Sequence, residues 1–283
     1  MIYWKNFAAT YFFSKRRWLY PVISVVVALS LCLGTPLPSR AASWFDILIR
    51  GVEVFQLTNV SERQEIDLGK QINQEITREV RLNKNPELVS YVEQIGRRLA
   101  AKSTRPNLPY TFQIVEDDSI NAFATAGGFL YVHTGLIKAA DNEAQLASVM
   151  AHEIGHITGR HLINQMRQQA IAAGIVTVAG LDRSAAVSIG VDLALKRPRS
   201  RKDEYEADKL GLQNLSKSGY AQSEMVAFMQ KLLGKGSVPT FLSTHPDTAQ
   251  RIKQIKKNIT IQPSSLKDGI DSATYKSKIR LLK

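Results

Sequence analysis

Cysteine is almost absent from this chain of 283 residues, which contains only one, Cys32. That residue lies in an apolar segment near the N-terminus. A single cysteine cannot form an intramolecular disulfide, and it cannot build a zinc site of several thiolates. Disulfide-stabilised folds and cysteine-ligated zinc are therefore excluded.

Long uninterrupted hydrophobic runs are also lacking. The N-terminal apolar segment, 19–33, has about 15 residues, fewer than the roughly 20 that a membrane-spanning helix needs. Lys15, Arg16 and Arg17 precede it, and small residues follow at Ser39 and Ala41, which is typical of a secretory signal peptide. We expect residues 1–41 to be a signal peptide, with a retained N-terminal anchor as the alternative. The protein is then expected in the periplasm or another extracytoplasmic compartment.

Acidic residues are fewer than basic ones, and the formal net charge is +12. Loss of the signal peptide would lower this charge to about +7, because residues 1–41 contain five basic residues and no acidic one. Part of the excess lies in the run 196–202. This run fits a solvated loop, and as an alternative it fits contact with an anionic membrane surface. No nucleic-acid partner is expected for an exported chain without a recognition motif.

Histidine is scarce as well, with five residues, yet two of them stand four apart in the sequence His-Glu-Ile-Gly-His. Residues at this spacing lie on one face of a helix, so His152 and His156 can bind the same metal ion. Glu153 lies beside them as a candidate general base. This is the H-E-x-x-H pattern of zinc hydrolases, and it predicts one Zn²⁺ per chain.

A catalytic zinc ion needs a third protein ligand. The metzincin pattern requires histidine at 162, where this chain has Leu162. On a continuous helix His161 points roughly 140° away from His156, so it is not expected to reach the same metal. The other source is a carboxylate from a later helix, for which Glu204 is the candidate. Asp208, one turn further, could accept the free ring N–H of a zinc histidine.

The H-E-x-x-H motif and the segment 200–208, which contains Glu204 and Asp208, resemble motifs of the gluzincin metallopeptidases. This group includes HtpX, the CAAX prenyl proteases and the periplasmic BepA-like enzymes. The resemblance extends from about 61 to 251, and it includes the stretches 121–132 and 243–251. One departure is Ala126, where the family usually has proline. No repeat of 20–50 residues is present, so the helical-repeat tail of some BepA-like members is not expected.

The resemblance also implies further site residues. His245 and Arg251 become candidate catalytic groups that stabilise the oxyanion. As an alternative, His245 occupies the fourth zinc position in a resting state. An edge strand is expected to pair with the substrate backbone, and its residues are Asn121, Ala122, Phe123 and Ala124.

The function implied is an exported zinc metalloendopeptidase that cleaves unfolded or misassembled envelope proteins. Glu153 would accept the proton of the attacking water. The alternative is a zinc-bound chaperone or assembly factor with little proteolysis. An inactive scaffold is disfavoured because Glu153 is present.

The expected fold class is α+β, dominated by helices, with a small sheet and a long zinc-binding helix from about 142 to 169. A capping box of Ser61 and Gln64 opens one helix, and Asn85 before Pro86 opens another. Alternating apolar residues predict a strand at 110–114, and Gly127 and Gly128 predict a turn between two further strands, 121–125 and 129–133. We expect a metallopeptidase domain over 42–260, followed by a basic tail, 261–283. The apolar stretch 170–195 is expected to form a packed helical hairpin, with a membrane-facing or gating segment as the alternative.

Overall fold

The structure is a computed structural model that describes residues 54–55, 57, 59–172, 181–234, 238–259 and 268–282. These residues belong to one compact unit, Glu53–Lys283. The predicted signal peptide or anchor, 1–41, lies outside the described residues, as does 173–180 within the apolar stretch. None of the described helices combines the length and the apolar character that crossing a membrane requires.

The two N-terminal helices begin where their capping residues predict. Helix α3 (Glu62–Glu79) starts with a capping box, in which the Gln64 N–H donates to Ser61 Oγ and the Ser61 N–H donates to Gln64 Oε1. Helix α4 (Pro86–Ala100) starts at Asn85, whose side chain accepts from two backbone N–H groups of the first turn. Both caps satisfy amides that have no partner within the helix. These predictions are confirmed.

A small mixed sheet follows, with strands β2 (Thr111–Val115), β3 (Ala122–Ala124) and β4 (Phe129–His133). The strand order is β2-β4-β3, with β2 parallel and β3 antiparallel to β4. The connection from β3 to β4 passes through a short 3-10 turn, η1 (Ala126–Gly128), in which Gly127 has a φ of 74°. Glycine adopts this left-handed conformation without strain. Because β3 is last in the strand order and pairs only with β4 among the described strands, it is an edge of the sheet, as predicted.

The helix that carries His152 and His156 is shorter than predicted. Helix α6 (Glu143–Thr158) begins at Asn142 and is followed by helix α7 (His161–Ala172). Arg160, between them, has a φ of 55°, which is not a conformation of right-handed helix. The prediction of one helix from 142 to 169 is therefore wrong, because periodicity did not reveal this left-handed residue.

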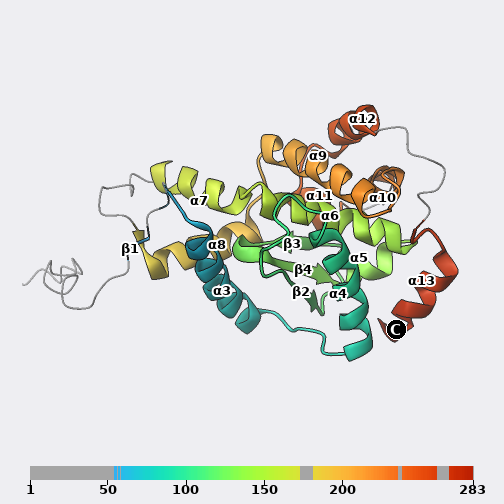
Figure 1. Cartoon of the computed structure of the whole chain (residues 1–283), viewed down its shortest axis with the longest axis horizontal. Helices are drawn as coiled ribbons and strands as arrows, with labels where there is room; N and C mark the ends of the chain where they lie inside the picture. Colours follow the sequence, from blue (N-terminus) through green and yellow to red (C-terminus); the bar gives the residue numbers. More distant parts are fainter. Residues whose placement is uncertain are drawn as a thin grey trace, which may run out of the picture. The chain divides into compact units, whose positions relative to one another are not determined.

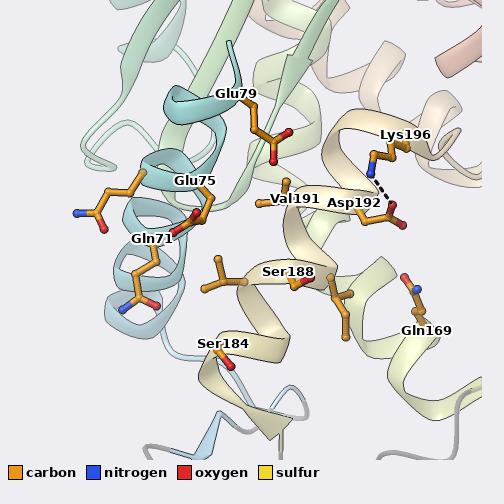
Figure 2. A pocket seen from close by; sticks show the side chains of 12 residues that line it. Gln71, Glu75, Glu79, Gln169, Ser184, Ser188, Val191, Asp192 and Lys196 are labelled. Carbon is orange, nitrogen blue, oxygen red and sulfur yellow. Dashed lines mark ion pairs between the residues drawn. The ribbon is translucent and has the colours of Figure 1, made fainter.

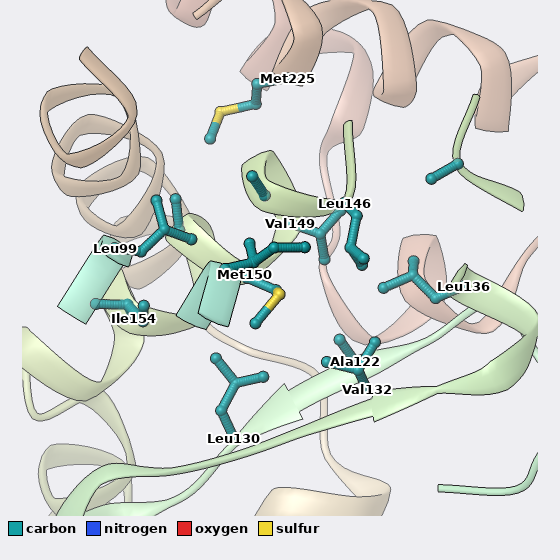
Figure 3. Close-up of a cluster of buried hydrophobic side chains, with 14 of the residues drawn as sticks. Leu99, Ala122, Leu130, Val132, Leu136, Leu146, Val149, Met150, Ile154 and Met225 are labelled. Carbon is teal, nitrogen blue, oxygen red and sulfur yellow. The ribbon is translucent and has the colours of Figure 1, made fainter. Parts of the chain in front are cut away.

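Helix α6 lies between the sheet and the helices α9 (Arg201–Lys217) and α10 (Ser223–Leu233) (Figure 1). Its apolar side chains form the middle of the hydrophobic core. Figure 3 shows Val149, Met150 and Ile154 of α6 among Leu130 of the sheet and Met225 of α10. Burial of such side chains is the main driving force that holds these layers together. The fold class is α+β and dominated by helices, as predicted.

The remaining elements complete the unit. The stretch after α7 forms strand β5 (Leu181–Asp182), which pairs with β1 (Val54–Phe55), and helix α8 (Arg183–Lys196), which packs against α7. Short helices α5 (Thr134–Ala139) and α11 (Thr240–Thr244) flank the core, and α12 (Thr248–Asn258) packs on α9.

The C-terminal segment packs onto the core. It forms α13 (Ser272–Ile279) and a final turn, η2 (Arg280–Leu282). Tyr275 is buried, and its hydroxyl donates to the Ile137 carbonyl at 2.6 Å. An apolar ring with a satisfied hydroxyl anchors this segment.

Candidate metal centre

Three side chains from two helices converge at one point. The Nε2 atoms of His152 and His156 on α6 lie 3.0 Å apart. Glu204 on α9 places one carboxylate oxygen 3.4 Å from His152 Nε2 and the other 3.3 Å from His156 Nε2. Ligands at about 2.0–2.1 Å from a tetrahedral zinc ion are about 3.3 Å apart. The two imidazoles and one carboxylate therefore fit zinc in both chemistry and spacing.

A second carboxylate, that of Glu153, lies next to this set. Ligand atoms of His152, Glu153, His156 and His245 all lie within 4.8 Å of one another. That grouping contains Glu153 and omits Glu204, but the contacts of Glu204 with both imidazoles make it the better third ligand. Both oxygens of Glu153 are buried and lack a hydrogen-bond partner among the described residues. A buried carboxylate without a partner is costly, which suits a group that binds a reacting water.

Glycine allows α6 and α9 to approach closely enough to form this set. A Cβ atom added to Gly155 would lie 2.6 Å from the Ala207 carbonyl oxygen. On α9, a Cβ added to Gly211 would lie 3.1 Å from the His152 backbone nitrogen. Larger side chains at these crossing points would hold the helices apart. Gly155, the glycine of the H-E-x-x-H motif, is therefore needed for helix packing, which the spacing of the motif did not reveal.

The outer nitrogens of the two histidines have partners of their own. Asp208 Oδ1 lies 3.0 Å from His152 Nδ1, the contact that the expected orienting role requires. The Nδ1 atom of His156 lies 2.8 Å from His161 Nδ1. Such contacts fix the tautomer and the orientation of a metal-bound imidazole. His161 was predicted only to miss the metal, and its contact with His156 was not foreseen.

The electrostatics of the centre favour a divalent cation. Burial raises the pKa of Glu204, but His245 and Arg251 hold it well below its usual range. Burial is the largest of the effects that lower the pKa of His156 well below its usual range; His152 and Arg199 act in the same direction, and Glu204 opposes them. Burial also opposes protonation of His152, yet hydrogen bonds to Asp208 and Glu204 raise its pKa to about 9. A histidine must be deprotonated to bind a metal, so a metal ion at His152 would compete with a proton.

Arg251 is fully buried behind the ligands. Its guanidinium donates to both oxygens of Asp208, at 2.8 and 2.7 Å, and to the His245 carbonyl. It also forms an ion pair of 2.6 Å with Glu204. A guanidinium engaged in this way with two carboxylates orients them. This geometry favours a positioning role over the expected role in stabilising an oxyanion.

His245 lies inside the ligand set. Its Nδ1 atom is 3.0 Å from Glu204 Oε1 and 3.2 Å from His152 Nε2. Its Nε2 atom is 3.4 Å from Glu153 Oε1. The ring therefore occupies space between the ligands and the candidate base, where an attacking water would have to lie.

Of the predicted substrate-binding residues, Ala122, Phe123 and Ala124 form β3 and Asn121 directly precedes it, and all four are buried. Ala122 opposes Val132, and Ala124 opposes Leu130. The His133 N–H donates to the Asn121 carbonyl, and the Thr125 N–H donates to the Phe129 carbonyl. In this antiparallel pattern Asn121 and Phe123 bond to β4, whereas the peptide groups of Ala122 and Ala124 face the free edge.

The basic run 196–202 is not a uniform solvated surface. Lys196 and Arg197 pair with Asp192, at 3.7 and 3.2 Å. Arg199 is buried, and it donates to the Ala124 carbonyl and to Gln165. Burial lowers the pKa of Arg199, although Glu153 and Glu204 oppose this effect. Neither the burial of Arg199 nor its contact with β3 was predicted.

A groove with a volume of about 880 Å³ lies elsewhere, between α3 and α8. Figure 2 shows polar side chains such as Gln71, Glu75 and Asp192 along it. Glu75 pairs with Arg78, and Asp192 pairs with Lys196. The groove contains none of the clustered metal-ligating side chains, so we place the chemistry at the histidine cluster.

Comparisons with known proteins agree with this site. The model of "Peptidase family M48" matches residues 86–259. The chain is 31% identical over 250 residues to the "Beta-barrel assembly-enhancing protease" of Escherichia coli (strain K12), covering 80% of this chain and 50% of that protein. A protein of Vibrio cholerae named "Putative beta-barrel assembly-enhancing protease" is 30% identical over 256 residues, covering 83% of this chain and 52% of its own length.

A eukaryotic relative is more distant. The "Mitochondrial metalloendopeptidase OMA1" of Schizosaccharomyces pombe is 27% identical over 237 residues, covering 75% of this chain and 70% of that protein. The chain thus spans about half the length of the bacterial relatives. The family model covers most of the described residues, including both metal-binding motifs. The chain therefore belongs to peptidase family M48.

Proposed function

We propose that this protein is a zinc-dependent endopeptidase. The observation that carries the proposal is the convergence of His152, His156 and Glu204 next to the buried carboxylate of Glu153. This carboxylate has no hydrogen-bond partner among the described residues. Family membership and relatives named as protease and metalloendopeptidase support the same activity.

Each side chain has a distinct task in the proposed reaction. A bound zinc ion supplies Lewis acidity that lowers the pKa of a coordinated water towards 7. Glu153 accepts the proton of the attacking water and later delivers it to the leaving amine. Asp208 and His161 orient the two imidazoles, while Arg251 holds Glu204 and Asp208 in place.

We propose that substrate binds as a strand along the free edge of β3. The N–H and C=O groups of Ala122 and the N–H group of Ala124 face that edge and can bond to an extended peptide, whereas the Ala124 carbonyl accepts from Arg199. Backbone pairing of this kind does not depend on the side chains of the peptide. An enzyme that binds its substrate through the backbone can cleave unfolded chains of many different sequences.

His245 is proposed to gate the site. Its ring lies among the ligands. The preceding helix α11 contacts the segment just before β3, where the Phe241 N–H donates to the Ile120 carbonyl at 2.9 Å. Thr244 Oγ1 also lies 3.5 Å from Asn121 Oδ1. Movement of this one segment would free both the metal position and the substrate edge.

The proposed substrates are unfolded or misassembled envelope proteins, in the periplasm or another extracytoplasmic compartment. The predicted signal peptide, 1–41, and the names of the bacterial relatives support this proposal. Contact with a membrane surface remains a proposal for the exposed part of 196–202. The blocking position of His245 supports the second candidate, an assembly factor with little proteolysis.

Digestion of casein by the purified protein tests the activity. We expect cleavage that a chelator abolishes and that added zinc restores. A zinc-loaded protein that prevents aggregation of an unfolded client but leaves casein intact would support the assembly factor instead.

A further inference from the structure

Arg199 is a buried arginine that the proposed reaction does not use. It lies in the connection between α8 and α9, directly before Ser200, which caps α9. Its Nη2 donates to the Ala124 carbonyl at 3.0 Å, and its Nη1 donates to Gln165 Oε1 at 3.1 Å. Its backbone N–H donates to the Thr244 carbonyl at 3.0 Å. The side chain is thus fixed at two points, one of which is the last residue of β3.

The carbonyl that Arg199 binds belongs to the free edge of the sheet. In an antiparallel pair, every second residue turns both of its peptide groups away from the partner strand. On β3 these residues are Ala122 and Ala124. Each outward carbonyl can accept one N–H from a substrate strand, whichever direction that strand runs. The guanidinium of Arg199 occupies one of these two positions.

The occupied position lies at the end of β3 that is close to the metal centre. Ala124, His156 and Arg199 line the same small cavity. Gln165, from α7, holds the guanidinium in place from the other side. Two fixed hydrogen bonds make the side chain a rigid part of this wall, because a planar guanidinium loses little further freedom when it donates.

We infer that Arg199 marks the end of the substrate strand, because its guanidinium fills the hydrogen-bond position that the next substrate amide would occupy. Backbone pairing is thereby limited to Ala122 and to the N–H of Ala124. Arg199 is a positioning residue in this role. It determines how many substrate amides contribute to binding on that side of the cleaved bond. The inference rests on the proposed endopeptidase function and on pairing with β3.

Single N-methylation of a peptide substrate tests the inference. A methylated amide cannot donate, so kcat/KM falls only where the N–H is used in binding. With a peptide taken from a casein cleavage site, we expect the wild type to be sensitive at the amide opposite Ala122. The amide two residues along, opposite the Ala124 carbonyl, should be insensitive. In Arg199→Met that second amide should become sensitive, and kcat/KM for the unmethylated peptide should rise about 2- to 10-fold.

Two further variants complete the test. Arg197→Met removes an exposed arginine two residues earlier in the chain, and its methylation profile should equal that of the wild type. Gln165→Leu loosens the guanidinium without removing the buried charge, so it should shift the profile in the same direction as Arg199→Met. It also provides the test if Arg199→Met does not fold, which circular dichroism will show.

The outcomes distinguish a failure of the proposed endopeptidase function from a failure of the role inferred for Arg199. A wild type that cleaves neither casein nor the peptide contradicts the proposed function. Where the wild type cleaves, profiles that are unchanged in both Arg199→Met and Gln165→Leu overturn the inference. A general rise in rate with no newly sensitive amide also overturns it, because that result means that Arg199 restrains the site without occupying a substrate hydrogen-bond position.

Discussion

The Nδ1 atoms of His156 and His161 lie 2.8 Å apart, so that one imidazole donates a hydrogen bond to the other. The contact depends on the break between α6 and α7, where Arg160 has a φ of 55°. It also depends on Gly159, because a Cβ atom there would lie 2.4 Å from His161 Nε2. The break turns a histidine that would point away from the metal into a partner of one of its ligands.

Replacement of His161 by leucine is therefore expected to weaken zinc binding. Loss of such an outer partner typically costs 10–100-fold in metal affinity. Competition with a coloured chelator measures the affinity, and His133→Gln, a change at a histidine on β4, is the control. An unaltered affinity in His161→Leu, with the fold intact, would remove His161 from the metal centre.

Replacement of Glu204 by glutamine is expected to strip or strongly weaken zinc. A neutral amide is a poorer ligand than a carboxylate, and it loses the ion pair with Arg251. Elemental analysis of the purified variant measures the zinc content. Glu79→Gln changes an exposed carboxylate on α3, away from the metal centre, and should keep its zinc. Full occupancy in Glu204→Gln would exclude Glu204 as a ligand.

Replacement of His245 by alanine separates the two roles left open by the sequence. A gating histidine competes with the attacking water, so its removal should raise basal cleavage of an unstructured substrate. An oxyanion donor, in contrast, would lower the rate by roughly 10²–10³-fold when removed. A comparison of turnover with the wild type at equal zinc content decides between them. A fall in turnover contradicts gating.

The local elements and the ligand types were predictable because they depend on short spacings. Histidines four apart share a helix face, and Ser61 and Asn85 mark helix starts through hydrogen bonds to their own neighbours. Contacts between distant segments were not predictable in the same way. The guanidinium of Arg251 reaches two carboxylates on α9, and Arg199 reaches β3, because of how the helices cross. Those helix crossings cannot be deduced from the residue spacings of a single sequence.

Replacement of Gly155 by alanine tests the helix crossing itself. The new Cβ would meet the backbone of Ala207 at 2.6 Å, where no flexible side chain can give way. Overpacking of this kind typically costs about 1–3 kcal/mol, so we expect a lower Tm and weaker zinc binding. Gly234→Ala is the matched control, since a Cβ atom there would lie 3.6 Å from the Lys231 carbonyl oxygen, an ordinary contact. Equal melting temperatures for Gly155→Ala and wild type would contradict the close approach.

The most direct test of zinc-dependent catalysis at this site is the casein cleavage rate of Glu153→Gln, measured together with its zinc content. The variant removes the proposed base but leaves His152, His156 and Glu204 unchanged. We predict zinc content equal to that of the wild type and a cleavage rate lower by about 10²–10⁴-fold. Wild-type cleavage by a zinc-loaded Glu153→Gln protein would contradict the proposed mechanism.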